Sequence, residues 1–129
     1  MSVRRTVAVA AAATVLLAPA RPSAAAGQER DKLFLTVSGA RNTWIRGLQL
    51  VCPSPPRAHH PHAAEACASL TAAQGRLDAL AGDHHLCTRE YEPVTATADG
   101  DWHGAALHWR KDYPNACELD AATGAVFRF

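Results

Sequence analysis

The segment EACASLTAAQGRLDALA, residues 65–81, carries the clearest periodic pattern in the chain. Its apolar residues recur at steps of three and four, which places them on one stripe of an α-helix. These residues are Ala66, Leu70, Ala73, Leu77 and Leu80. Gly82 follows the pattern and is a residue type that commonly ends a helix. The segment therefore predicts an amphipathic helix that buries one face against the rest of the fold.

Two segments before this helix have the composition of β-strands. Residues 33–37 (LFLTV) are rich in apolar, aromatic and β-branched side chains. In residues 44–52, every second side chain from Leu48 to Cys52 is apolar, as expected for a strand with one buried face. Residues 53–61 contain four prolines, which predicts a loop between the second strand and the helix.

After the helix, the pattern predicts an irregular segment and then a hairpin. Residues 82–93 show neither the helical nor the strand period of apolar residues, whereas residues 94–98 and 102–110 are typical of strands. The dipeptide Asp99–Gly100 between those strands is a strong signal for a tight turn. The remaining predicted elements are a short helix over residues 114–122 and a last strand over residues 126–129.

This order of elements predicts an α+β domain in which an antiparallel sheet of about five strands is covered on one face by two helices. A chain of 129 residues, 48% of them apolar, has room for one domain with a modest core. The balance of 13 basic and 12 acidic residues gives no electrostatic reason to expect a nucleic-acid partner. The small size argues against a large cofactor-binding enzyme, and we expect no cofactor.

Residues 1–26 have the three parts of a secretion signal. Arg4 and Arg5 provide a positive start, and an apolar run follows over residues 6–18. The segment ends in SAAA, which satisfies the small-x-small cleavage rule. The apolar run is too short to span a membrane as a helix. We therefore expect a secreted, extracellular protein from which this segment is removed.

Cleavage defines the expected domain organisation and the charge of the mature chain. Residues 27–32 are predicted to be a flexible tail, and residues 33–129 the folded domain. The removed segment contains three arginines and no acidic residue, so the mature chain is slightly acidic and has no membrane partner. Export also places the thiols in an oxidising compartment, where disulfides persist.

Four cysteines, Cys52, Cys67, Cys87 and Cys117, are available for disulfides, and four cysteines allow three pairings. Their spacing alone does not choose among these pairings. A bridge between the first two would stabilise the fold by about 3 kcal/mol, and one between the last two by about 3.5 kcal/mol. Because a small core is only marginally stable, such bridges are expected to matter.

The segment LCTREYEP, residues 86–93, is charged and lies between a cysteine and a proline. Here the chain resembles the Streptomyces subtilisin inhibitor family over about residues 33–129. The resemblance rests on matching cysteine spacing and on a series of motifs. These are LFLTV, the proline-rich loop between Cys52 and Cys67, CASLTAAQGRLDAL, CTREYEPV, DGDWHG, the block Asn115-Ala116-Cys117-Glu118, and VFRF.

The resemblance implies a fold, a covalent framework and a site. Family members pair neighbouring cysteines, which implies the bridges Cys52–Cys67 and Cys87–Cys117, and they generally form homodimers through the sheet. The reactive bond would lie between Arg89 and Glu90, with Asn115 and Pro93 supporting the loop. The residues that would contact a protease are Leu86, Cys87, Thr88, Arg89, Glu90, Tyr91 and Glu92. For the dimer surface, Phe34 and Trp102 are candidates.

The implied function is a secreted serine protease inhibitor, which is not an enzyme. An arginine in the primary pocket of a protease requires a carboxylate at the base of that pocket, as trypsin-like enzymes provide. Arg89 therefore predicts strong inhibition of trypsin-like proteases, with inhibition of subtilisin-like proteases partly retained. Glu90 departs from the family pattern. An acidic residue directly after the reactive bond repels some proteases, so Glu90 is expected to narrow the range of targets.

Two alternatives remain open from the sequence. The first is a small secreted hydrolase with a pair of catalytic carboxylates drawn from Asp99, Asp101 and Asp112. The second keeps the fold but inhibits a metalloprotease or a transglutaminase through another surface. A metal site is not expected, although the chain has several closely spaced histidines in its loops. These are His59, His60, His62, His84 and His85.

Overall fold

The computed structural model describes residues 10–19 and 30–129. Most of the predicted secretion signal and most of the predicted tail lie outside these ranges. Residues 10–19 form neither helix nor strand and are exposed. Across the described ranges, no helix has both the length and the apolar character needed to cross a membrane.

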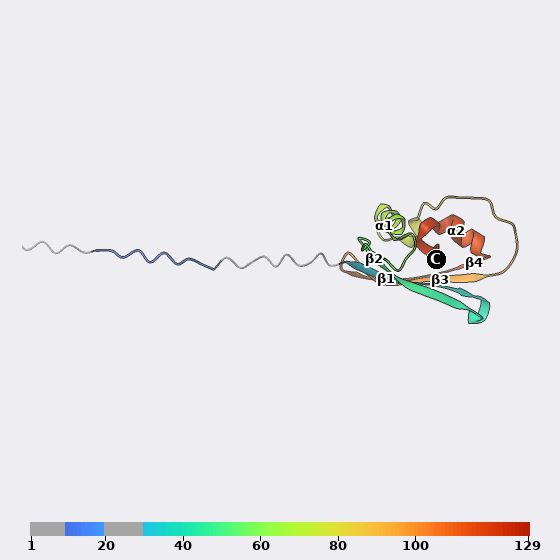
Figure 1. Ribbon diagram of the computed structural model, residues 1–129, viewed down its shortest axis with the longest axis horizontal. Helices are drawn as coiled ribbons and strands as arrows, with labels where there is room; N and C mark the ends of the chain where they lie inside the picture. Colours follow the sequence, from blue (N-terminus) through green and yellow to red (C-terminus); the bar gives the residue numbers. More distant parts are fainter. Residues whose placement is uncertain (1–9, 20–29) are drawn as a thin grey trace, which may run out of the picture.

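A four-stranded antiparallel sheet forms one layer of the domain, with strand order β2-β1-β3-β4 (Figure 1). Its strands are β1 Asp31–Gly39, β2 Ile45–Cys52, β3 Val94–Trp102 and β4 Ala105–Tyr113. A single 3-10 turn, η1 Ala40–Asn42, connects β1 to β2. The first strand begins two residues earlier than predicted, inside the segment that was expected to be a flexible tail.

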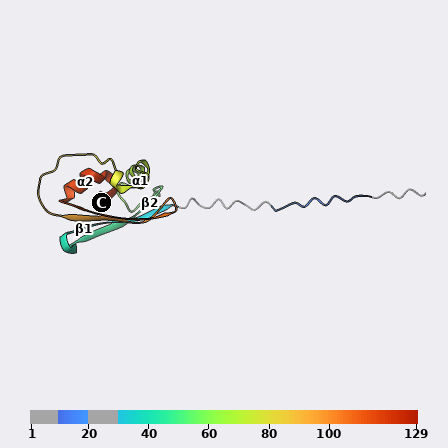
Figure 2. The ribbon, with the colours of Figure 1, turned by 180° about the vertical axis from the view of Figure 1, so that it is seen from behind.

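The second layer consists of two helices, α1 Ala63–Ala72 and α2 Ala116–Thr123, which lie on the same side of the sheet (Figures 1 and 2). The two-residue period of β1 explains why one face is covered: Leu33, Leu35 and Val37 are buried, whereas Phe34 between them is 52% exposed. The predicted α+β fold, with two helices on one face of an antiparallel sheet, is therefore confirmed.

The predicted helix ends earlier than expected, at Ala72 instead of residue 81. The backbone reverses at Gln74 and Gly75, which have φ angles of 55° and 74°. At Gly75 a Cβ atom would collide with the indole ring of Trp102, so a residue without a side chain is needed there. The stripe is nevertheless buried as predicted up to Leu77, which begins the 3-10 helix η2 Leu77–Ala79.

The predicted hairpin forms, but its turn lies elsewhere. Trp102 pairs with Ala105, so His103 and Gly104 are the two turn residues. Their φ angles of 49° and 80° are both positive, as the type I′ turn of a two-residue hairpin requires. Asp99 and Gly100 instead lie within β3. The prediction of a turn at this dipeptide is wrong because a glycine in a strand can also mark a close backbone approach, here to Lys32 of β1.

The predicted last strand is wrong, and the sheet has four strands instead of about five. Residues Gly124–Phe127 form a 3-10 helix, η3, immediately after α2. Val126 and Phe127 are buried in the core on the helix side of the sheet, so these apolar side chains leave solvent without strand pairing. Trp102, expected at a dimer surface, is also in the core, where its ring packs over Gly75.

His60 is a buried histidine that links the proline-rich loop to η3. It is 2% exposed. Its Nε2–H donates to the Val126 carbonyl at 2.9 Å, and its Nδ1 accepts from the His62 amide at 2.9 Å. Both ring nitrogens are therefore used by the neutral form. Burial lowers the pKa of His60, because the charged ring would lose its hydration.

This environment predicts that acid destabilises the fold through His60. The imidazole of the unfolded chain takes up a proton near its ordinary pKa of about 6.5, whereas the folded chain resists protonation until a lower pH. Between these two pKa values the unfolded state binds more protons, so the free energy of unfolding falls as the pH is lowered from the ordinary pKa to the folded pKa. Urea denaturation at about pH 7.5 and about pH 5 would measure this.

The matched variants are His60→Gln and His59→Gln, since His59 is adjacent and exposed. His60→Gln should lose this part of the pH dependence, and His59→Gln should retain it. Equal pH dependence in both variants would contradict the assignment.

Candidate functional site

A long irregular segment, residues 80–93, connects η2 to β3 and arcs away from the body of the domain (Figure 1). Its central residues 88–92 are all exposed. Leu86 and Tyr91 are 98% and 82% exposed, although both are large side chains that would gain from burial. Arg89 and Glu90 are among these exposed residues, and within residues 30–129 neither forms an ion pair. The segment therefore presents side chains outward.

Both implied disulfides are present, and one of them anchors this segment. Cys87 is bonded to Cys117 in the first turn of α2, and Cys52 at the end of β2 is bonded to Cys67 of α1. The first bridge closes a separation of 30 residues and the second one of 15. All four cysteines lie in the described region and all are paired.

Asn115 contacts the exposed segment from the domain side. It is the N-cap residue of α2: its Oδ1 accepts from the Glu118 amide at 2.8 Å. This hydrogen bond fixes the orientation of the side-chain amide, which is buried. The Nδ2 group then donates to the carbonyls of Thr88 at 3.3 Å and of Glu90 at 2.8 Å. Asn115 thus holds the carbonyls of the residues on either side of Arg89.

Backbone hydrogen bonds attach both ends of the segment to α2 and its preceding turn. At the start, the amides of Asp83 and His84 donate to the Ala121 carbonyl at 3.1 and 3.2 Å. At the end, the Glu92 amide donates to the Pro114 carbonyl at 2.9 Å. Pro93 follows and fixes the φ angle where the chain enters β3. The segment is therefore held to the domain at its start, its centre and its end.

A charged network that sequence analysis missed lies beside the start of the segment. Arg128 Nε donates to Asp120 Oδ1 at 2.8 Å, and its Nη2 donates to Asp83 Oδ2 at 3.0 Å. His85 Nε2–H donates to Asp120 Oδ2 at 2.7 Å. Arg128 lowers the pKa of Asp120, and Asp120 raises the pKa of His85. Because these groups are partly exposed, their contribution to stability is small, and their main effect is to order His85.

A family model described as subtilisin inhibitor-like matches residues 29–115. The chain belongs to the subtilisin inhibitor-like family. Members of this family are protease inhibitors and not enzymes, which agrees with the expectation from sequence. The matched range contains the whole exposed segment, both cysteines of the Cys52–Cys67 bridge, and Asn115 at its end.

Individual relatives agree with this assignment. A subtilase-type protease inhibitor of Streptomyces coelicolor is 42% identical over 102 residues, which cover 75% of this chain and 71% of the relative. Subtilisin inhibitor-like protein 2 of Streptomyces rochei is 41% identical over 102 residues, with 75% and 90% covered.

A solved structure agrees as well. Streptomyces caespitosus sermetstatin, crystallised in complex with Bacillus licheniformis subtilisin, superposes with a TM-score of 0.61 at 29% identity. The match covers 78% of this chain and 98% of that chain.

The aspartates considered for a hydrolase do not form a catalytic pair in this family member. Asp99 Oδ1 accepts from His108 Nδ1–H at 2.9 Å, and Asp112 Oδ1 accepts from Thr95 Oγ1 at 2.6 Å. Both hydrogen bonds join directly opposed residues of β3 and β4, and both carboxylates are exposed. Asp101 is exposed near the hairpin turn. These carboxylates are therefore accounted for as cross-strand and surface groups.

Proposed function

We propose that the protein is a secreted serine protease inhibitor whose residues 86–92 bind a protease as a substrate does, with Arg89–Glu90 as the reactive bond. The observation that carries the proposal is the contact of Asn115 Nδ2 with the carbonyls of Thr88 and Glu90. This contact braces the backbone on both sides of that bond while leaving the side chains exposed.

A braced, exposed backbone has the two properties that such inhibition requires. First, a segment already held in one conformation loses little entropy when it docks, so more of the contact energy appears as affinity. Second, if the protease cleaves the bond, the disulfide and Asn115 keep the new amine next to the acyl carbon. The effective concentration of that amine then favours resynthesis of the bond over release.

The identity of Arg89 supports trypsin-like targets. A guanidinium that enters the primary pocket forms a charge-assisted, bidentate hydrogen bond with the carboxylate at the base of a trypsin-like pocket. In an apolar pocket the same group would lose hydration without gaining a partner. Subtilisin has an open pocket that tolerates long side chains, and the sermetstatin relative was crystallised with a subtilisin. We therefore expect trypsin to be inhibited strongly and subtilisin to be inhibited as well.

Parallel titration of trypsin, subtilisin and chymotrypsin with the purified protein tests the proposal. Stoichiometric loss of trypsin activity is expected, with weaker inhibition of chymotrypsin. After prolonged incubation, mass spectrometry should find one cut, between Arg89 and Glu90, in a protein that still inhibits. Absence of inhibition of all three enzymes, or a first cut at another bond, would refute the proposal.

Asn115→Asp separates the two roles of this side chain. Aspartate keeps the acceptor that caps α2, so the free energy of unfolding should stay within about 1 kcal/mol of the original. The carboxylate cannot donate to the Thr88 and Glu90 carbonyls, and it repels them. We expect trypsin to hydrolyse the inhibitor at least about tenfold faster, as measured by loss of intact protein over time. Asn115→Ala, which removes both roles, should also lower stability by about 1 kcal/mol. Unchanged hydrolysis in Asn115→Asp would rule out the bracing role.

We further propose that the protein forms a homodimer through the face of the sheet that the helices leave uncovered. Phe34 and Ile45 are large apolar side chains on this face, and at 52% and 63% exposed they would gain from burial. Phe34→Lys should shift the protein from dimer to monomer in sedimentation equilibrium. A monomeric original protein, or an unaffected variant, would exclude this face.

Export is proposed on the pattern of residues 1–26. N-terminal sequencing of protein recovered from the medium of an expressing bacterium should show that this segment has been removed. An intact start at Met1 would contradict cleavage.

A further inference from the structure

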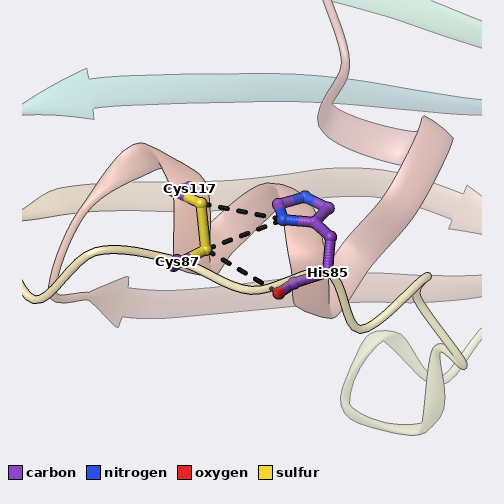
Figure 3. A group of neighbouring side chains, drawn as sticks. All are labelled: His85, Cys87 and Cys117. Carbon is purple, nitrogen blue, oxygen red and sulfur yellow. Dashed lines mark hydrogen bonds between the residues drawn. A yellow bond between two sulfur atoms is a disulfide. The ribbon is translucent and has the colours of Figure 1, made fainter.

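His85 lies directly against the disulfide that anchors the exposed segment (Figure 3). Its Nδ1 atom is 3.7 Å from the sulfur of Cys87 and 3.7 Å from the sulfur of Cys117. The ring therefore faces both sulfurs equally. Neither the disulfide nor the proposed inhibitory mechanism requires an imidazole at this place, so the arrangement needs a separate explanation.

Asp120 determines which nitrogen of His85 faces the sulfurs with a lone pair. The Asp120 carboxylate accepts a hydrogen bond from Nε2 at 2.7 Å, which places the proton of the neutral ring on Nε2. Arg128 in turn holds the Asp120 carboxylate at 2.8 Å. A histidine whose outer nitrogen donates to a carboxylate is the usual arrangement of a metal-ligating histidine.

The distances match those of a zinc site. Zinc binds cysteine sulfur at about 2.3 Å and histidine nitrogen at about 2.0–2.1 Å, with tetrahedral angles. These values place a nitrogen and a sulfur ligand about 3.6 Å apart, and two sulfur ligands about 3.8 Å apart. The Nδ1–sulfur distances are 3.7 Å, and the three ligand atoms lie within 4.8 Å of one another. Only the two sulfurs would have to separate, which happens once their bond is broken.

We propose that reductive opening of the Cys87–Cys117 disulfide creates a zinc site whose ligands are the two sulfurs and His85 Nδ1, with a fourth position open to water. A phosphine supplies the two electrons: phosphine, disulfide and water give phosphine oxide and two thiols. Zinc binding then releases the two thiol protons. Two cysteine ligands, one histidine and an open position are a combination that zinc adopts in proteins.

Two further observations support this site. The bound unit of Zn²⁺ and two thiolates is neutral, as the disulfide is, so zinc adds no net charge beside Asp83, Asp120 and Arg128. The bridge is also the more accessible one: Cys87 and Cys117 are partly exposed, whereas Cys52 and Cys67 are 6% and 8% exposed. Since reduction requires access to a sulfur, mild reductant should open Cys87–Cys117 first.

Cobalt(II) titration of the mildly reduced protein tests the proposal. A phosphine is used because dithiol reductants chelate metals themselves. Alkylation and mass spectrometry should first establish that Cys87 and Cys117 are free while Cys52–Cys67 is intact. Cobalt should then give thiolate charge-transfer absorption and the visible absorption of a tetrahedral ion, and one equivalent of zinc should abolish both. The oxidised protein should give neither.

Matched variants distinguish this site from unspecific binding by thiols. His85→Asn should weaken cobalt and zinc binding at least about tenfold, whereas His84→Asn, on the adjacent exposed histidine, should bind like the original. Asp120→Asn should weaken binding about 10- to 100-fold. The double variant Cys87→Ser, Cys117→Ser should lose the charge-transfer absorption. Equal affinity and spectra in His85→Asn and the original protein would overturn the proposal, whether or not the reduced chain stays folded.

Discussion

Arg89→Met is expected to weaken the inhibition of trypsin about a thousandfold or more while leaving the inhibition of subtilisin within about tenfold. The substitution leaves the carboxylate of the trypsin pocket buried without a partner, which costs about 4 kcal/mol or more, and about 1.4 kcal/mol corresponds to a factor of ten. In subtilisin, methionine removes the desolvation cost of the guanidinium and fills the pocket with an apolar side chain. Inhibition constants for both enzymes, measured side by side, give the two ratios.

The control for this substitution is Arg57→Met, which changes an exposed arginine in the proline-rich loop. Both variants lose one positive charge at the surface, so a general electrostatic effect on trypsin binding would appear in both. A selective loss in Arg89→Met assigns the effect to the pocket. If trypsin inhibition were unchanged, the protease would have to bind another surface of the protein.

The parts of the fold that depend on local periodicity were predictable from the sequence. The alternation in β1 and the helical stripe from Ala66 to Leu77 each predict which side chains are buried, because burial of one face determines both patterns. The helix end and the hairpin turn were not predictable, because Gln74 and His103 adopt positive φ without being glycine. These conformations depend on their surroundings: Gln74 precedes Gly75, over which the Trp102 ring packs, and His103 lies in a two-residue hairpin turn that requires positive φ.

The candidate site likewise has one part that was predictable from the sequence and one part that was not. The exposed loop, the two disulfides of the domain and Asn115 were predicted from the family resemblance, and the hydrogen bonds of Asn115 then gave a physical reason for its place. The network of Asp83, His85, Asp120 and Arg128 was not foreseen. Its hydrogen bonds join residues 35 and 45 positions apart, and no periodic or motif signal relates such residues before the chain is folded.

The second large effect is expected from the double variant Cys87→Ser, Cys117→Ser, which should convert the protein from an inhibitor into a substrate. The bridge closes a separation of 30 residues, and its loss lowers the free energy of unfolding by about 3.5 kcal/mol. Its larger consequence is local. Without the bridge, only hydrogen bonds hold the segment, so the acyl end at Arg89 and the new amine at Glu90 separate after cleavage and resynthesis fails.

The pattern of cleavage separates this local effect from general unfolding. Trypsin should cut the double variant first and rapidly between Arg89 and Glu90, and inhibition should disappear at the rate of that single cut. Simultaneous cuts at other arginines, together with loss of the far-ultraviolet circular dichroism, would mean that the bridge serves the whole fold. That outcome would leave Asn115 and the backbone contacts as the source of loop rigidity. Asn115→Asp, made in the disulfide-bonded protein, would then be expected to reduce inhibition more than loss of the bridge does. Persistent, stoichiometric inhibition by the double variant would show that the bridge is dispensable for holding the cleaved ends together.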